Sequence, residues 1–367
     1  MNSKRKLYQI ALTFLKGIGP KKIGILISKL SSIEMIFEES IRDVHEKTKI
    51  PLSILNNMDR IQAIEKAKEQ LDFIQNNNIQ THFYLDANYP RRLKQCNDAP
   101  ILLYSRGDFD VNPKRVVAIV GTRHSSEYGK ELTRDLAKEL QPYNVQIVSG
   151  LAYGTDYNAH KAAVDFNITT LAVLGHGLDR IYPYTHHGLA QKMCENGGLL
   201  TEFPIKTKPD RINFPMRNRI VAGMSDALVI IESKKRGGAM ITAELAFDYN
   251  RDIFAYPGSA RQENSFGCNL LIQKNMSHLM ACPNDLIKLM GWENSKTSPK
   301  KPDYTPSSVL LSDLENSIFS LLKNKGVMHF DKLLIDLQIS SQDLNSNLFN
   351  LELGGIIKSL PGKIYSI

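Results

Sequence analysis

Between residues 115 and 256, short apolar runs alternate with longer amphipathic segments in a regular order. The apolar runs predict buried strands at 116–120, 145–148, 170–174, 199–201, 227–231 and 253–256. The amphipathic segments predict helices at about 126–140, 156–166, 186–196, 213–223 and 239–250. This alternation is typical of a mostly parallel α/β sheet that is covered on both faces. Because crossover connections keep one hand, the loops that follow the strands should meet along one edge of the sheet.

The chain on either side of this core, which we place at 85–293, predicts smaller domains. Residues 1–84 have helical periodicity around the turn Gly17-Ile18-Gly19-Pro20, in the manner of a SAM or helix-hairpin-helix domain. Such a turn can hold a phosphate on its backbone N–H groups, and a plain turn between two helices is the alternative. Residues 294–308 are rich in Pro, Ser and Lys, which predicts a flexible linker. Residues 309–367 indicate three helices and a hairpin around Pro361-Gly362, an order that resembles a winged helix.

Composition narrows the class of protein. At 367 residues and 42 % hydrophobic, the chain is long enough for two or three domains with buried cores. No apolar run approaches the roughly 20 residues that a membrane-spanning helix needs. The 4 cysteines stand far apart, which fits neither a disulfide framework nor a zinc site and predicts a cytoplasmic protein. The net charge of +8 is compatible with a polyanionic partner.

Glycines and basic residues recur in the loops after the predicted strands. Glycines there let backbone N–H groups approach a phosphate, and the facing helix ends add partial positive charge. The sequence contains neither a P-loop nor a strict G-x-G-x-x-G after the first strand, so it predicts neither ATP hydrolysis nor NAD binding and no cofactor. The candidate nucleic-acid-binding residues are Gly121, Thr122, Arg123, Ser149, Gly150, Phe214, Arg217, Asn218, Arg219, Lys234, Gly237 and Gly238.

The segment 213–223 combines several of these features. Asn213 is placed to cap a helix whose first turn contains Phe214 and a proline. Phe214, Arg217 and Asn218 then share one face at the positive end of that helix. A flat ring beside an arginine and an amide suits a phosphate with a stacked base. In the alternative interpretation, Phe214 belongs to the core and the arginines are solvated.

Acid–base chemistry is a competing interpretation of the same loops. The carboxylates expected near the strand ends are Asp156, Asp179, Glu202, Asp226, Glu232 and Glu244, with His160 and His176 beside them. They could in principle act as acids or bases, but no H-E-x-x-H, Ser/His/Asp or Cys–His arrangement accompanies them. The pattern favours structural roles in which these side chains cap helices and anchor the basic loops.

Six segments together resemble the DNA-processing protein A family (DprA, also called Smf). They are Val117-Ala-Ile-Val-Gly-Thr-Arg123, Ser149-Gly-Leu-Ala-Tyr-Gly-Thr-Asp156 with His160, Leu174-Gly-His-Gly-Leu-Asp-Arg-Ile-Tyr-Pro183, Asn213-Phe-Pro-Met-Arg-Asn-Arg-Ile-Val-Ala-Gly223, Gly237-Gly-Ala-Met-Ile-Thr-Ala243, and Pro257-Gly258 with Ser265, Gly267 and Asn269. Two places depart from the family pattern. His186 stands where an asparagine is usual, and Gly237-Gly238-Ala239 replaces a Ser-Gly-Ser loop.

The resemblance implies a Rossmann-like, doubly wound core that binds single-stranded DNA, forms a homodimer and passes the strand to the RecA recombinase during natural transformation. It implies that Arg123 grips the strand and that Phe214 lies against a base. Arg217 and Arg219 become backbone or structural partners. A ring that stacks on a base and a cation that binds a phosphate together bind single-stranded DNA of any base sequence. The resemblance implies a binding protein rather than an enzyme.

Two alternatives remain beside this interpretation. The core is also distantly similar to the nucleotide phosphoribohydrolases, for which Gly237, Gly238 and Glu244 would act on a nucleotide, although the complete glycine-rich motif is missing. The C-terminal domain could instead read a DNA sequence. Residues 309–367 carry 5 Lys against 6 Asp and Glu, and the predicted third helix at 341–353 has no Lys or Arg. Groove binding requires phosphate neutralisation, so a protein contact is favoured for that domain.

Overall fold

The computed structural model describes residues 3–292, 311–354, 356–360 and 364–366. The first compact unit ends at Trp292, and the second comprises the described residues from Leu311 onward. The predicted linker at 294–308 and the predicted hairpin tip at Pro361-Gly362 lie outside the described residues. In the part of the chain that is described, no helix is both long enough and apolar enough to cross a bilayer.

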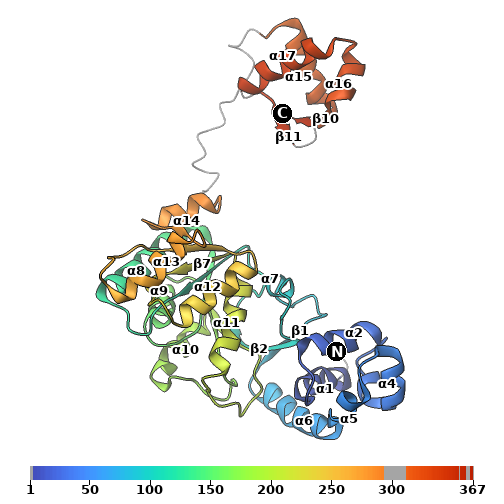
Figure 1. Ribbon diagram of the computed structural model, residues 1–367, viewed down its shortest axis with the longest axis vertical. Coiled ribbons are helices and arrows are strands. Elements are labelled where there is room, and N and C mark those ends of the chain that lie inside the picture. The colour runs from blue at the N-terminus through green and yellow to red at the C-terminus, as the bar shows by residue number, and fades with distance from the viewer. Residues whose placement is uncertain (1–2, 293–310, 355, 361–363, 367) are drawn as a thin grey trace. The chain divides into compact units, whose positions relative to one another are not determined.

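A group of short helices begins the first unit, drawn in blue beside β1 and β2 in Figure 1. They are α1 Ser3–Ala11, the 3-10 turn η1 Leu12–Phe14, α2 Pro20–Lys29, α3 Met35–Glu38, α4 Ile41–Thr48, α5 Leu52–Asn56 and α6 Arg60–Asn76. Their fully buried side chains, such as Ile10 and Leu26, share one core with Phe83 of β1 and Tyr104 of β2. The helices therefore pack against one end of the sheet and stabilise it.

The central sheet has nine strands and is mostly parallel, as the sequence predicts. The strands are β1 Gln80–Phe83, β2 Leu102–Asp108, β3 Arg115–Val120, β4 Val145–Ser149, β5 Thr170–Val173, β6 Gly197–Thr201, β7 Ala227–Ile230, β8 Asp252–Ala255 and β9 His278–Leu279. Their spatial order is β1-β2-β6-β5-β4-β3-β7-β8-β9. From β6 to β9 every neighbouring pair is parallel, and only β1 and β2 join antiparallel.

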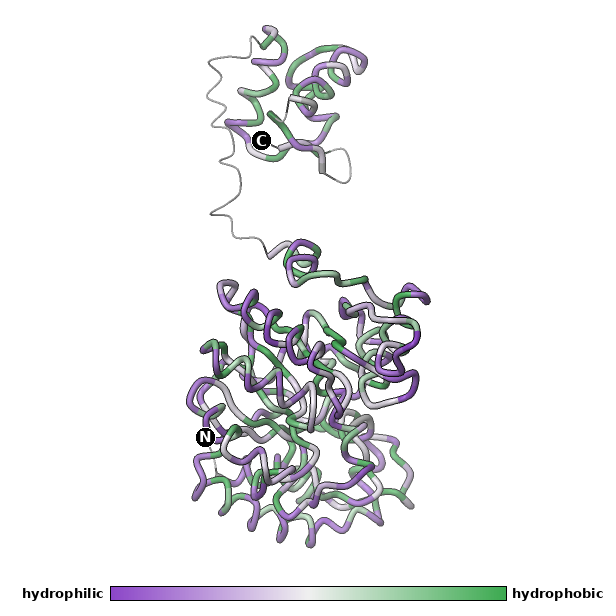
Figure 2. The backbone as a smooth tube through the Cα atoms, turned by 90° about the vertical axis from the view of Figure 1, so that its left-hand side faces the viewer, coloured by the Kyte–Doolittle hydropathy of each residue, from purple (hydrophilic) through white to green (hydrophobic). Residues whose placement is uncertain are grey.

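Helices cover both faces of the sheet (Figure 1), and along the chain of the first unit hydrophobic (green) and hydrophilic (purple) stretches alternate (Figure 2). They are α7 Arg91–Lys94, α8 Glu127–Leu140, α9 Thr155–Asp165, α10 His187–Met193, α11 Asn213–Met224, α12 Gly238–Asp248, α13 Phe266–Gln273 and α14 Pro283–Leu289. One core lies under α8, α9 and α14, and another lies under α7, α11, α12 and α13. The helix predicted at 186–196 is shorter, because the 3-10 turn η3 Tyr184–His186 precedes α10.

The strand order reverses at β3. The chain passes from β3 to β4, β5 and β6 on one side and then crosses to β7, β8 and β9 on the other. In open α/β sheets, ligands bind beyond the carboxyl ends of the strands at such a reversal. The loops after β3, β4, β5, β6 and β7, which we call the rim, are therefore the expected binding region.

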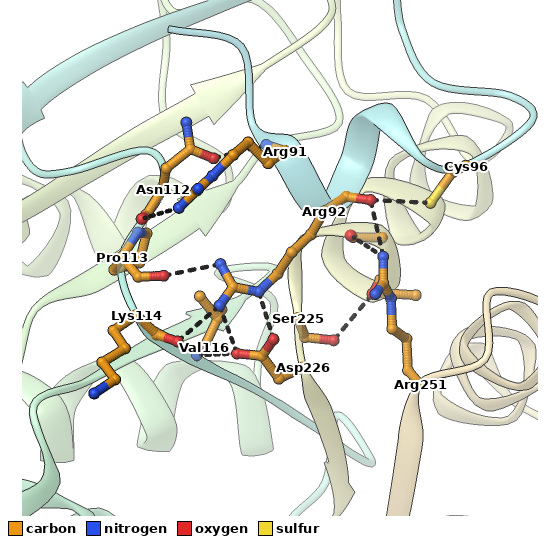
Figure 3. Close-up of polar contacts among 12 residues, drawn as sticks. Arg91, Arg92, Cys96, Asn112, Pro113, Lys114, Val116, Ser225, Asp226 and Arg251 are labelled. Carbon is orange, nitrogen blue, oxygen red and sulfur yellow. Dashed lines mark hydrogen bonds and ion pairs between the residues drawn. The ribbon is translucent and has the colours of Figure 1, made fainter. Parts of the chain in front are cut away.

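At the amino ends of the strands, opposite the rim, a hydrogen-bond network surrounds Arg92 (Figure 3). Its guanidinium forms a bidentate pair with Asp226, at 2.5 and 2.8 Å, and also donates to two backbone carbonyls of the β2–β3 connection. Asp226 in turn accepts a hydrogen bond from the backbone N–H of Val116 at 2.8 Å. The sequence-based placement of Asp226 near the rim is wrong, because this residue precedes β7 and so lies at the amino end of the strand.

The second unit contains three helices and a small sheet, in agreement with the predicted winged helix. Its elements are α15 Asp313–Lys325, β10 Met328–His329, α16 Phe330–Leu337, α17 Ser341–Leu353, β11 Lys358–Leu360 and β12 Ile364–Ser366. The antiparallel strands have the order β10-β12-β11. A capping box between Ser312 and Glu315 fixes the start of α15, and Ile318, Leu333 and Leu344 lie in the core.

Candidate nucleic-acid interface

The loop after β3 is fixed by its neighbours and presents Arg123. The backbone N–H of Thr122 donates to the carbonyl of Glu232 at 2.8 Å, and the Thr122 carbonyl accepts from the Thr155 N–H at 3.1 Å. The Glu232 carboxylate accepts from both the N–H and the hydroxyl of Ser126, at 2.9 and 2.6 Å. Ser126 caps α8, so Glu232 anchors the basic loop as the sequence predicts. Arg123 itself is exposed.

Arg123 and Phe214 come from distant segments and meet on the rim. The Arg123 guanidinium lies 5.7 Å from the centre of the Phe214 ring, within the range of a cation–π contact. The Tyr182 ring lies 5.9 Å from the same ring at 36°. A Cβ on Gly175 would come within 3.1 Å of Phe214 Cδ1, so glycine at that position leaves room for the ring. Half-buried Phe214 keeps part of its ring accessible beside an exposed cation.

The predicted cap at Asn213 is wrong. The helix begins at Asn213 itself, its cap position is Ile212, and in the described part of the chain no side chain caps it. The Asn213 amide instead donates to the carbonyl of Lys208 at 3.3 Å, which ties the preceding loop to the first turn of α11. The positive end of α11 therefore keeps backbone N–H groups that are not satisfied by a side-chain cap.

Arg217 faces the protein interior. It is 4 % exposed, and its guanidinium donates to the carbonyl of Val173 at the end of β5. A Cβ on Gly150 would collide with this guanidinium, so glycine after β4 is required by the buried arginine. Burial lowers the pKa of Arg217, and the charge of Asp156 opposes that shift. Arg217 joins β4, β5 and α11 into one frame beneath the rim.

Arg219 is also buried, on the other side of α11. Its guanidinium pairs with the Glu202 carboxylate and donates to the carbonyl of Asp98. Burial raises the pKa of Glu202, while the adjacent Arg219 opposes this rise. A buried arginine that is already paired cannot also grip a strand on the surface. We therefore correct the sequence-based list by giving Arg217 and Arg219 the structural role, which the family resemblance also allowed.

Three small residues at the ends of β3 and β4, Gly121, Ser149 and Gly150, pack against neighbouring segments of the protein. A Cβ on Gly121 would collide with the Thr155 side chain, so Gly121 lets α9 approach β3. The hydroxyl of buried Ser149 donates to the carbonyl of Ile119 at 2.6 Å. With Gly150 against Arg217, the side-chain positions of these residues face protein atoms. The sequence-based prediction that the backbone N–H groups of Gly121 and Gly150 approach a phosphate stays a prediction.

The loop between β7 and α12 carries exposed positive charge. Asn218 joins it to α11, because its amide donates to the carbonyl of Gly238 at 3.3 Å. Gly237 and Gly238 are both exposed, and among the described residues no atom lies within 4 Å of a Cβ placed on Gly237. Lys234 is paired with Glu263 at 2.8 Å, so part of its charge is already compensated.

Two polar residues that are buried under the rim, Asp156 and His160, have environments that favour their uncharged forms. Asp156 accepts from the N–H of Ala152 at 3.3 Å, and burial raises the pKa of its carboxyl group. His160 Nδ1 lies 2.8 Å from the Thr170 hydroxyl, and burial lowers the pKa of His160 to about 3. Glu244, the residue that the enzymatic alternative requires, is exposed on α12. Of these three residues Glu244 is exposed, whereas Asp156 and His160 are buried on α9 and held in structural contacts.

Replacing His160 with asparagine should reduce the loss of stability in acid. The folded-state pKa of His160, about 3, lies below the ordinary value of 6.5, so the folded protein binds fewer protons than the unfolded chain between these values. Stability is therefore lost as pH falls below 6.5. Between pH 7 and pH 5 the variant should lose about 2 kcal/mol less unfolding free energy than the wild type.

Urea unfolding at the two pH values measures this difference for the first unit. The His278→Asn variant changes an exposed histidine and should keep the full wild-type dependence on pH. An unchanged pH dependence in the His160→Asn protein would contradict a neutral, buried His160.

Comparison with known proteins identifies the family. Residues 80–291 match the family described as DNA recombination-mediator protein A, and residues 300–363 match the DprA winged helix domain. The chain belongs to the DNA recombination-mediator protein A family. It is 34 % identical to protein Smf of Escherichia coli over 75 % of this chain and 74 % of that protein. It is 29 % identical to protein Smf of Synechocystis over 100 % of this chain and 99 % of that protein.

Solved structures of family members share the fold. DNA processing protein A from Streptococcus pneumoniae aligns with a TM-score of 0.65 at 30 % identity, covering 77 % of this chain and 97 % of that one. DNA processing protein A from Helicobacter pylori aligns with a TM-score of 0.53 at 31 % identity, covering 58 % and 95 %. The latter structure is described as showing a unique single-stranded DNA binding mode of that protein.

One departure from the DNA recombination-mediator family pattern has a structural explanation. His186 is buried, and its Nδ1 lies 2.9 Å from the carbonyl of Leu151. Its ring also contacts the rings of Tyr153 and Tyr157, with centres 5.0 and 4.5 Å away. The histidine therefore ties the loop after β5 to the loop after β4.

Sequence reasoning missed several exposed residues of the rim in this family member. Among the described residues, Lys235 and Arg236 have no ion-pair partner, in contrast to Lys234. Tyr182 is 46 % exposed beside Phe214. The run Lys234-Lys235-Arg236 was a visible signal for the cations. No sequence signal placed Tyr182 against Phe214, because their contact depends on how the loops after β5 and β6 fold together.

Proposed function

We propose that this member of the DNA recombination-mediator family binds single-stranded DNA along its rim. The observation that carries this proposal is the contact between exposed Arg123 and the half-buried ring of Phe214. A cation can neutralise a phosphate, and a ring can stack on a base of any sequence. Arg123 stands on a loop held by hydrogen bonds to Glu232, and Phe214 lies in the first turn of α11, so little ordering is needed on binding.

Two further observations support single-stranded DNA as the ligand. Exposed Lys235 and Arg236 add cations on the loop after β7, which is the immediate neighbour of β3 in the sheet. The Helicobacter pylori relative, 31 % identical, is described as binding single-stranded DNA. Stacking on Phe214 requires a base face, which a base-paired and stacked duplex does not offer.

A wider role for the protein is proposed from its family. We propose that it is a homodimer without catalytic activity, that it protects incoming DNA in the cytoplasm, and that it transfers the strand to RecA during natural transformation. The description of the family as a recombination mediator supports such a transfer. The free thiols of Cys96, Cys194, Cys268 and Cys282 suit a reducing compartment. RecA-dependent strand exchange with and without the protein would test the transfer, and sedimentation would test the dimer.

Fluorescence anisotropy of a labelled oligo-dT tests strand binding directly. The wild-type protein should bind, should resist competition by a duplex of equal length, and should lose affinity as salt rises. If Arg123, Lys235 and Arg236 each neutralise one phosphate, log Kd should change with log salt by a slope of about 2. Hydrolysis of nucleoside monophosphates without binding of oligo-dT would instead favour the alternative enzyme.

Phe214→Ala should weaken oligo-dT binding by roughly 5- to 150-fold, the cost of losing one base–ring stack of about 1–3 kcal/mol. The salt slope should stay unchanged, because no phosphate contact is removed. Phe214→Trp keeps a stacking face and should retain affinity. Equal weakening by the tryptophan and alanine variants in anisotropy would contradict stacking at this position.

A further inference from the structure

Exposed tyrosines continue the ring surface from Phe214 along the rim. Tyr182 and Tyr184, in the loop after β5, are 46 % and 79 % exposed, and Tyr153, in the loop after β4, is 48 % exposed. Single exposed rings are common on proteins. Here three of them stand on the loops after two neighbouring strands, and one of the three, Tyr182, lies beside the Phe214 ring that Arg123 contacts. Their shared position requires an explanation.

These rings are held in place by contacts behind them. Tyr184 stacks on His187, with ring centres 5.7 Å apart and an interplanar angle of 30°. The Thr185 hydroxyl lies 3.5 Å from the Tyr153 hydroxyl, which brings the two loops together. Buried His186 packs against the Tyr153 ring and fixes both loops to the backbone of Leu151. Each tyrosine therefore exposes its ring from a constrained position.

The exposed cations and the exposed tyrosines stand on loops that follow different strands. Lys235 and Arg236 follow β7, and Arg123 follows β3, whereas Tyr153 follows β4 and Tyr184 belongs to the loop after β5. These four strands are consecutive in the sheet, in the order β7-β3-β4-β5. Neighbouring strands lie about 4.8 Å apart, so three spacings cover roughly 14 Å along the rim. That length exceeds the width of a single base.

We propose that Tyr153 and Tyr184 form a second stacking platform, which holds at least one base beyond the base on Phe214 and Tyr182. This inference rests on the proposed binding of single-stranded DNA. The strand then runs across the carboxyl edge from β7 towards β5. Its phosphates lie against the cations after β7 and β3, and its bases lie against the rings after β4, β5 and β6. Ring contacts of this kind do not discriminate between bases.

A scan with abasic sites tests the second platform. A single abasic residue is moved through a labelled oligo-dT, and affinity is measured by anisotropy at each position. The wild type should show two separate groups of sensitive positions. Replacing both Tyr153 and Tyr184 with alanine should weaken binding to intact oligo-dT roughly 5- to 150-fold and abolish the sensitivity of one group only. Phe214→Ala should abolish the sensitivity of the other group.

Matched variants control for indirect effects. Tyr153→Phe and Tyr184→Phe keep the stacking face and should bind like the wild type. Phe247→Ala removes a ring that is 52 % exposed in the last turn of α12, away from the rim, and should also bind like the wild type. Circular dichroism melting confirms that each variant folds. Because Tyr184 is 79 % exposed, the single Tyr184→Ala variant provides the test if the double variant is unstable.

The outcomes separate this inference from the proposed function. If oligo-dT binds and requires Arg123, but the abasic scan shows one sensitive group or the tyrosine variants leave the scan unchanged, the second platform is refuted alone. If the wild type does not bind oligo-dT, or binds it equally without Arg123, the rim itself is the wrong site and both ideas fail.

Discussion

Replacing Arg123 with alanine is expected to weaken single-stranded DNA binding by about 10- to 150-fold without lowering stability. A hydrogen bond to a charged group contributes about 1.5–3 kcal/mol, and Arg123 is the exposed cation that stands over the Phe214 ring. Loss of one phosphate contact should also reduce the salt slope by about 0.7. Anisotropy across a salt series gives both quantities, and thermal melting gives the stability.

Arg134 supplies a matched control for this variant. It is an exposed arginine whose guanidinium lies 4.8 Å from the Phe166 ring, but it stands within α8 rather than on the rim. Arg134→Ala removes the same charge and the same kind of ring contact. It should leave affinity within about twofold of the wild type, because exposed charges away from a site act weakly through screening at physiological salt. Equal losses in the two variants would mean that net charge, not the rim, governs binding.

Replacing Glu202 with alanine should produce the largest loss of stability, about 3–5 kcal/mol. The Arg219–Glu202 pair is nearly buried, with side chains 10 % and 13 % exposed, and the variant leaves the arginine charge without its partner. Folded protein at low temperature should still bind oligo-dT, because Arg123 and Phe214 are untouched. Urea unfolding of the first unit measures the stability.

An exposed ion pair gives the comparison for Glu202. Glu127 lies 2.7 Å from Lys130 on α8, with side chains 85 % and 48 % exposed. Glu127→Ala should cost less than about 1 kcal/mol, since solvent-exposed pairs contribute little. A similar small cost for Glu202→Ala would contradict the structural role assigned to Arg219.

Much of the fold was predictable because its signals are local. The apolar runs that form β3, β4 and β7 are fully embedded between helices, so they read as continuous hydrophobic segments. The crossover rule then brings the following loops to one edge, and that is how Arg123 and Phe214 could be assigned to a common site. Glu232 likewise took the anchoring role expected of a strand-end carboxylate, through its hydrogen bonds from Ser126.

Other features depended on tertiary contacts that periodicity does not encode. Arginine is usually exposed, and only the structure shows Arg217 and Arg219 buried against Val173 and Glu202. Asp226 follows a helix and directly precedes β7. The sequence-based interpretation placed it at the carboxyl end of a strand, whereas it lies at the amino end. The exposed tyrosines gave no periodic signal, because loop residues follow no repeat.

The most direct test of the account is to crosslink the DNA where it lies. An oligo-dT carrying a photoreactive halogenated uracil at single positions would be irradiated with the wild-type protein, and crosslinked peptides would be identified by mass spectrometry. The account predicts crosslinks to peptides that contain Phe214 and Tyr182. Crosslinks confined to α1–α6 or to the winged helix, with none on the rim, would contradict it.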